Sequence, residues 1–294
     1  MREFKTFHPF VNLLYFVAVI FFTMFLTHPI FLILSFITSL IFLIKAVGLS
    51  EVKSKLLYLS VFFIVLALVN PLFVHKGATP LFYMNGNAVT LEACIYGIVF
   101  ALMLISVIFW FFSFNKIMTS DKIIYVFSTF MPTIGLMISM ILRFIPRFQT
   151  QLKKIIEMNK IGDNPYKSKS IIRRLGVIFK TFSILVTWAF ENSIDTANTM
   201  KARGYGLKNR TTFHLYKFEL RDIIFIVFIV VNLLLNIYLY FSLNMRFYYY
   251  PEISPITIDL GSIINYLSYF LLLLMPIIIE IKEEIRWKLL LSKI

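Results

Sequence analysis

Cysteine is almost absent from this chain of 294 residues, which carries only Cys94. A single thiol excludes an intramolecular disulfide and any metal site built from a cysteine cluster. Acidic residues are also scarce, with 15 Asp and Glu against 29 Lys and Arg, and charged residues make up only 15% of the chain. Because soluble domains carry about a quarter of charged residues, an ordinary soluble protein is a poor match.

Familiar catalytic signatures are missing as well. The chain has no His-Glu-x-x-His, no Gly-x-Ser-x-Gly and no phosphate-binding Gly-x-x-x-x-Gly-Lys-Ser/Thr. We therefore expect no catalytic residue, no bound cofactor and no ATP hydrolysis in this chain. The four histidines are scattered, and His8 and His28 each precede a proline at the end of an apolar segment. An interfacial role is favoured over metal binding for both, and we expect no metal site.

Apolar residues dominate what is present. Hydrophobic residues make up 59% of the chain, including 33 Phe. About 17 to 25 apolar residues cross a bilayer as a helix. Six segments qualify: Phe10–Thr27, Pro29–Val47, Leu56–Val74, Ala93–Phe114, Asp222–Ser242 and Ser262–Ile281. The connections His75–Glu92 and Asn244–Gly261 hold Pro, Gly and Asn, which indicates turns. These observations predict an all-α polytopic membrane protein. No small-residue cleavage site follows the first apolar run, so we expect that helix to be retained.

Basic residues fall almost entirely on one side of these six spans. The alternation of connections puts 27 of the 29 Lys and Arg on that side, and only Lys76 and Arg246 on the other. Cytoplasmic loops carry an excess of Lys and Arg, so both termini should be cytoplasmic, in a bacterial cell membrane if the family resemblance described below holds. The orientation of the chain in the membrane then explains the net charge of +14. Membrane lipid is the expected partner of these basic residues, and no nucleic acid is needed as a partner.

A long connection divides the chain into residues 1–114 with four spans, 115–221, and 222–294 with two spans and a basic tail. The connection contains two further apolar runs, Ile123–Ile145 and Gly176–Phe190. If both crossed the membrane, eight Lys and Arg from residues 147 to 174 would lie outside. The charge rule opposes this arrangement. We therefore expect two helical runs at or near the cytoplasmic membrane surface, covered by another protein.

Proline and glycine should divide this middle module into helices. Pro132 and Pro146 are expected to break its first apolar run. An amphipathic helix should follow and end at Gly162, and one long helix, or two abutting ones, should end at Gly204. The second end carries the triplet Ala202-Arg203-Gly204. Arg203 is either a simple helix cap, or an arginine presented to a carboxylate of a partner with its planar, bidentate guanidinium.

Several stretches together resemble the transmembrane coupling subunit, or T component, of energy-coupling factor importers. They are the early `HPFVNLL`, the `LRFIPRF` entry into the module, and the `ENSIDTANTMKARGYG` helix end. The order of four spans, module and further spans is also similar, so the resemblance covers nearly the whole chain. The helix end with Ala-Arg-Gly is its most specific part. The family usually carries Lys where this chain has Asn12.

The resemblance implies a non-catalytic scaffold with three partners. Two cytoplasmic ATPases, which bind ATP and magnesium, would seat the helix tips, and a small membrane subunit would bind a vitamin or a transition-metal ion. The second coupling motif corresponds to Ala202, Arg203 and Gly204. The first motif corresponds to Lys160, Ile161 and Gly162, where Ile161 replaces the family's arginine.

The apolar runs of the middle module should form the seat for the substrate-binding subunit. The seat is expected to include Met137, Met140, Phe144, Phe179 and Phe182. The alternative is a self-sufficient permease or carrier, and the scarcity of ionisable groups within the spans argues against it.

Overall fold

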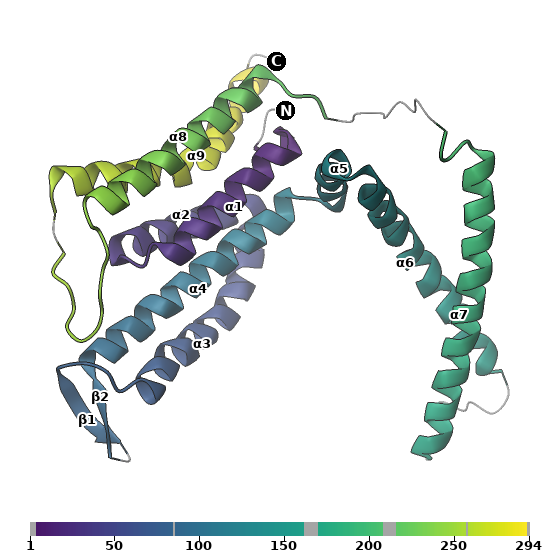
Figure 1. Ribbon diagram of the computed structural model, residues 1–294, viewed down its shortest axis with the longest axis horizontal. Coiled ribbons are helices and arrows are strands. Elements are labelled where there is room, and N and C mark those ends of the chain that lie inside the picture. Colours follow the sequence, from purple (N-terminus) through teal and green to yellow (C-terminus); the bar gives the residue numbers. More distant parts are fainter. Residues whose placement is uncertain (1–3, 85, 162–169, 208–215, 257, 293–294) are drawn as a thin grey trace. The chain divides into compact units, whose positions relative to one another are not determined.

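The computed structural model describes residues 4–84, 86–161, 170–207, 216–256 and 258–292. The chain forms two compact units (Figure 1). The first, here called the membrane unit, comprises residues 1–123 and 216–294. The second, the coupling unit, comprises residues 124–215. The functional division at residues 114 and 221 stays a prediction.

The described residues are mostly helical, as predicted. The membrane unit contains a short 3-10 helix η1 (Phe4–Thr6) and the helices α1 (Pro9–Phe25), α2 (Pro29–Val47), α3 (Leu49–Phe73), α4 (Leu91–Ile117), α8 (Leu220–Ser242) and α9 (Leu260–Leu291). A hairpin of β1 (Pro80–Met84) and β2 (Asn87–Thr90) joins α3 to α4. The helix α5 (Ser120–Phe130) leads into the coupling unit, which contains α6 (Pro132–Asn159) and α7 (Ile171–Ala202).

All six predicted spans are helices. Five of the described helices, α2, α3, α4, α8 and α9, are long and apolar enough to cross a membrane. The sixth, α1, is apolar but shorter, with 17 residues. Neither α6 nor α7 is among these candidate spans, in agreement with the charge argument. The largest boundary differences are at α3, which already begins at Leu49, and at α9, which continues to Leu291.

Hydroxyl groups connect four helices inside the membrane unit. Thr23 Oγ1 of α1 lies 2.8 Å from Ser35 Oγ of α2 and 3.3 Å from the Tyr269 hydroxyl of α9. Trp110 of α4 donates its indole N–H to Ser35 Oγ at 3.1 Å. All four side chains are fully buried. Sequence reasoning counted the few ionisable groups in the spans and overlooked these uncharged ones, which serve as bonds between helices.

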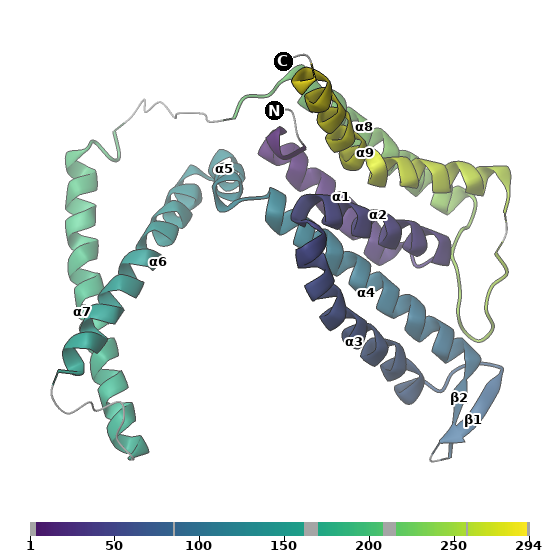
Figure 2. The same ribbon diagram turned by 180° about the vertical axis from the view of Figure 1, so that it is seen from behind.

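An aromatic core surrounds this cluster. Phe4, Phe16 and Phe42 are completely buried, and their ring centroids lie 6.1 to 6.3 Å apart. Trp110 packs against Phe42 with centroids 5.8 Å apart. Helices α2 and α3 both pack on α4, as the two opposite views show (Figures 1 and 2). The many phenylalanines thus fill the space between helices with tilted and edge-on pairs, the arrangements that aromatic rings prefer.

The connection between α3 and α4 is more ordered than its turn residues indicated. It contains the antiparallel hairpin of β1 and β2, with Tyr83 paired to Ala88. Glu92, in the first turn of α4, accepts bonds from the Thr79 hydroxyl at 2.9 Å and the Thr79 amide at 3.2 Å. A predicted loop is therefore a hairpin tied to the start of the next helix.

Pro146 does not break the helix that contains it. Pro132 occupies the first turn of α6, where a missing N–H is harmless, but Pro146 lies inside this continuous helix. The predicted break was wrong because one lost backbone hydrogen bond is compensated by packing. Two residues later, Phe148 makes an edge-on contact with Trp188 of α7 at a centroid distance of 5.6 Å.

Two glycines that both lie inside helices should have opposite effects on stability when each is replaced by alanine. A Cβ atom at Gly97 of α4 would lie 2.4 Å from the Ala67 carbonyl oxygen of α3, whereas one at Gly176 of α7 would meet nothing within 4 Å. We expect Gly97→Ala to destabilise the purified chain by about 1–3 kcal/mol through overpacking. Gly176→Ala should stabilise it by about 0.5–1 kcal/mol. Thermal unfolding in one detergent measures both, and equal shifts would contradict the close approach of α3 and α4.

Candidate functional site

The triplet Ala202-Arg203-Gly204 forms a complete helix-stop motif at the end of α7. The Tyr205 amide donates to Met200 O at 3.0 Å, and the Gly204 amide donates to Lys201 O at 3.0 Å. These two bonds are the Schellman pattern, which satisfies carbonyl groups that the helix end leaves free. Gly204 has φ +79°, the left-handed region that favours glycine. A Cβ there would also lie 2.9 Å from Leu207 Cδ1, so glycine has two reasons to occupy this position.

Arg203 is presented at the surface of this tip. It is the last residue before the turn, and its side chain is exposed, as is that of Ala202. No ion pair within the described residues involves Arg203. The cap interpretation and the presentation interpretation are therefore compatible: the backbone stops the helix, while the guanidinium points to solvent and is available to a partner.

The first tip has a different surface. Helix α6 ends at Asn159, and the Lys160 amide donates to Glu157 O at 3.0 Å. Lys160 is exposed, and Ile161 is 84% exposed. Gly162, the last residue of the predicted motif, lies outside the described residues. The first tip thus exposes a lysine and an isoleucine where the second exposes an arginine.

The two tips lie at opposite ends of a crossed helix pair. Helices α6 and α7 run antiparallel, because Phe148 contacts Trp188 while the later Asn159 bonds to the earlier Thr181 at 3.1 Å. The α6 tip therefore lies beside Thr181, and α7 continues for 21 residues to Ala202. At 1.5 Å per helical residue, the two tips are about 30 Å apart. This spacing lets each tip bind a different protein molecule.

The residues predicted for the apolar seat are only partly gathered on the surface. Met137 is 56% exposed, Phe179 69% and Phe182 62%. Met140 and Phe144 are half-buried, and Phe144 stacks on Phe148 with centroids 6.0 Å apart. The coupling unit therefore exposes large apolar side chains on both α6 and α7, as an interaction surface requires.

Both His-Pro pairs are helix caps. His8 Nδ1 accepts the Phe10 amide at 3.3 Å, and His28 Nδ1 accepts the Ile30 amide at 3.4 Å. The other nitrogen of His28, Nε2, lies 3.3 Å from the Tyr266 hydroxyl. Burial lowers the pKa of His28 to about 4, so its imidazole is neutral. Within the described ranges, no group of three His, Cys, Asp or Glu could hold a metal ion.

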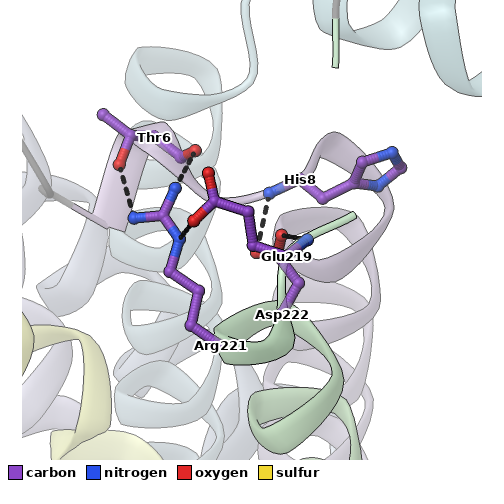
Figure 3. A network of polar contacts seen from close by, with 5 residues as sticks. All are labelled: Thr6, His8, Glu219, Arg221 and Asp222. Atoms are coloured by element: carbon purple, nitrogen blue, oxygen red, sulfur yellow. Dashed lines mark hydrogen bonds and ion pairs between the residues drawn. The ribbon is translucent and has the colours of Figure 1, made fainter. Parts of the chain in front are cut away.

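Residues that follow the coupling unit are anchored to the start of α1 (Figure 3). Asp222 Oδ1 accepts the His8 amide at 3.2 Å, and its Oδ2 accepts the Glu219 amide at 2.9 Å. Arg221 donates to the Thr6 hydroxyl and carbonyl, both at 3.4 Å. It also forms an ion pair with Glu219 at 3.0 Å. The start of α8 is thereby fixed to the N-terminal segment.

The residues that precede the coupling unit are anchored to the same segment. Lys122 of α5 is 4% exposed and donates its ammonium group to Lys5 O. With the Asn12 amide oriented to satisfy both its groups, Oδ1 accepts from Lys122 Nζ at 3.1 Å and Nδ2 donates to Phe4 O at 3.3 Å. Burial and the nearby Lys5 lower the pKa of Lys122 to about 8. Sequence reasoning noticed Asn12 only as a missing lysine, whereas the structure brings Lys122 to it.

Because the pKa of His28 is lowered in the folded chain, we expect the free energy of unfolding to decrease in mild acid. The unfolded imidazole has a pKa near 6.5, whereas the folded one has a pKa of about 4, so only the unfolded chain takes up a proton between these values. The stabilisation is complete above pH 6.5 and disappears as the pH falls to 4, a loss of about 3 kcal/mol.

Thermal unfolding of the purified chain between pH 7 and pH 4 measures this loss. In the variant His28→Asn, the asparagine can still cap α2 but does not titrate, so stability should depend less on pH. A profile identical to that of the unsubstituted chain would contradict the role of His28.

No family model matches the chain. Three curated relatives carry the name energy-coupling factor transporter transmembrane protein EcfT. The Staphylococcus aureus protein is 26% identical over 180 residues, which are 58% of this chain and 67% of that relative. The Exiguobacterium sibiricum protein is 34% identical over 107 residues, or 36% of this chain and 41% of the relative. The Listeria innocua protein is 34% identical over 90 residues, which are 30% of this chain and 34% of that relative.

The matched region thus spans two thirds of the first relative and less than half of the other two. The six curated matches are all named as energy-coupling factor transporter transmembrane proteins, and their similarity agrees with the helical, multi-pass character of the structure. The resemblance seen in the sequence is confirmed: the chain is a multi-pass membrane protein similar to the transmembrane components of energy-coupling factor transporters.

Proposed function

We propose that this protein is the force-transmitting scaffold of an energy-coupling factor importer. The observation that carries the proposal is the coupling unit with its two tips about 30 Å apart along α7, one of them ending in an exposed arginine. Two separate cytoplasmic ATPases seat the two tips. A small membrane-embedded subunit binds the transported vitamin or transition-metal ion and sits on the apolar residues of the unit.

Arg203 makes the charged contact with one ATPase. Its guanidinium pairs with a carboxylate in a groove of that ATPase, where the planar fork allows two parallel hydrogen bonds. Ala202 keeps the tip slender, and Gly204 turns the chain away directly after Arg203. The tip can thus enter a narrow groove without a bulky side chain on either side of the arginine.

The ATPases supply the energy, and this chain transmits it. ATP and magnesium bind to the partner subunits, and closure of the two ATPases moves the two tips relative to each other. Because each tip is continuous with about three to four helical turns beyond the crossing point, its displacement changes the apolar surface near that crossing. The substrate-binding subunit responds by releasing its cargo to the cytoplasm, where both termini of this chain lie.

A self-sufficient carrier has less support. Such a protein needs polar groups free to contact a substrate within the spans. Here the hydroxyls of Thr23, Ser35 and Tyr269 bond to one another. Asn236 of α8 likewise donates to Ser268 of α9 at 3.0 Å. These hydroxyl and amide N–H groups are therefore used to join helices, whereas Asn236 Oδ1 is buried without a hydrogen-bond partner.

Arg203→Ala should abolish uptake while the chain stays in the membrane. The loss of a desolvated interfacial charge pair costs about 2–5 kcal/mol, enough to detach one ATPase. Substrate uptake by cells and co-purification of the ATPases measure the effect. Lys201→Ala is the matched control, since Lys201 is an exposed cation on the same tip that does not adjoin the turn. Normal uptake by Arg203→Ala would refute the proposed contact.

A charge at the seat should release the substrate-binding subunit and leave the ATPases bound. Met137→Glu places an unpaired carboxylate in an apolar interface, at a cost of about 3–5 kcal/mol. Met158→Glu is the control, because Met158 is 71% exposed on the same helix but lies near its tip. Co-purification from native membranes compares both partners, and loss of the ATPases first in Met137→Glu would contradict this division of surfaces.

A further inference from the structure

A cationic pocket lies where α6 and α7 cross. It has a volume of about 390 Å³ and is lined by Pro146, Arg147, Thr150, Gln151, Lys154, Trp188 and Asn192. The pocket lies wholly within the coupling unit. It lies on the helix shafts, at least five residues from the end of α6 and ten from the end of α7. A role in seating the tips therefore does not account for it.

Its charge is positive and not neutralised from within. Arg147 and Lys154 are seven residues apart on α6, so they project from nearly the same face of the helix. The lining contains no carboxylate. No ion pair found among the described residues involves either cation. Two cations held near each other without a counter-ion favour an anionic ligand.

The other lining groups suit a phosphate. Gln151 lies one helical turn from Arg147, and Asn192 one turn from Trp188, so two side-chain amides adjoin the cations as N–H donors. The Thr150 hydroxyl already donates to Pro146 O at 2.9 Å, so it does not add to these donors. A phosphate oxygen takes hydrogen bonds from guanidinium, ammonium and amide groups, and the pocket offers all three.

Apolar side chains next to the pocket indicate the source of the phosphate. Phe148, one residue beyond Arg147, is 36% exposed, and Ile184, one turn before Trp188, is 41% exposed. Trp188 itself lines the pocket and contacts Phe148. A free phosphate ion gains nothing from such neighbours. A lipid places its headgroup on the cations and its acyl chains along the apolar side chains.

We propose that this pocket binds the phosphate headgroup of an anionic phospholipid at the crossing of α6 and α7. The location of the lipid in the cytoplasmic leaflet, and its place between the tips and the apolar seat, rest on the proposed function. The bound lipid would join the two helix shafts at their contact, between the tips and the apolar seat. Lipid composition would then influence the stiffness of the coupling unit.

Lipid titration of the purified full-length chain tests the proposal. The chain is freed of lipid in a neutral detergent, and phosphatidylglycerol is added while bound lipids are counted by native mass spectrometry. Arg147→Gln and Lys154→Gln should each weaken the tightest binding event about fivefold, and the double variant about 25-fold. Lys153→Gln is the matched control, since Lys153 is exposed beside Lys154 but does not line the pocket.

Four outcomes would overturn the proposal. The double variant could bind phosphatidylglycerol as tightly as the unsubstituted chain, or Lys153→Gln could lose as much affinity as Lys154→Gln. Phosphatidylcholine could bind equally well, which would remove the role of the cations. Inorganic phosphate or glycerol phosphate at millimolar concentration could displace the lipid, which would assign the pocket to a soluble phosphate. None of these results depends on ATPase binding, so the proposed function is tested separately.

Discussion

One short segment, residues 4–12, binds the residues that flank the coupling unit on both sides. Lys122, just before that unit, donates to Lys5 O and reaches Asn12. Arg221 and Asp222, just after it, bind Thr6 and the His8 amide. The segment is itself fixed, because Phe4 is fully buried in the aromatic core. The residues on both sides of the coupling unit are therefore bound to one and the same segment of the membrane unit.

Hydrogen bonds in the interior of the membrane unit hold its helices in fixed positions. In a bilayer, helices gain little from apolar contact alone, because the lipid is equally apolar. The bonds among Thr23, Ser35, Tyr269 and Trp110 supply direction and specificity across α1, α2, α4 and α9. Such hydroxyls are each bonded to a partner, so shifting one helix leaves a buried polar group unsatisfied, at a cost of about 1–3 kcal/mol. The bundle should thus move as one body.

The helices could be predicted from the sequence because their signals are local. Length and apolarity marked six spans, and Gly204 marked a helix stop. The anchors could not be predicted in this way. Lys122 and Lys5 are 117 residues apart, and Arg221 and Thr6 are 215 apart, so no spacing rule connects them. Pro146 was misjudged for a similar reason, since the packing that outweighs its local effect comes from α7.

The difference between the two tips follows from their positions in this arrangement. The α7 tip is close in sequence to residues 216–222 and their anchor, so the ionic contact proposed for Arg203 would act on the shorter covalent path to the membrane unit. The α6 tip is connected to that unit only through the full length of α6 and α5. Ile161, 84% exposed, gives that tip an apolar contact, which tolerates sliding because it is not directional. Under the proposed function, we expect one directional and one non-directional contact to turn α7 about its crossing with α6 when the distance between the two ATPases changes.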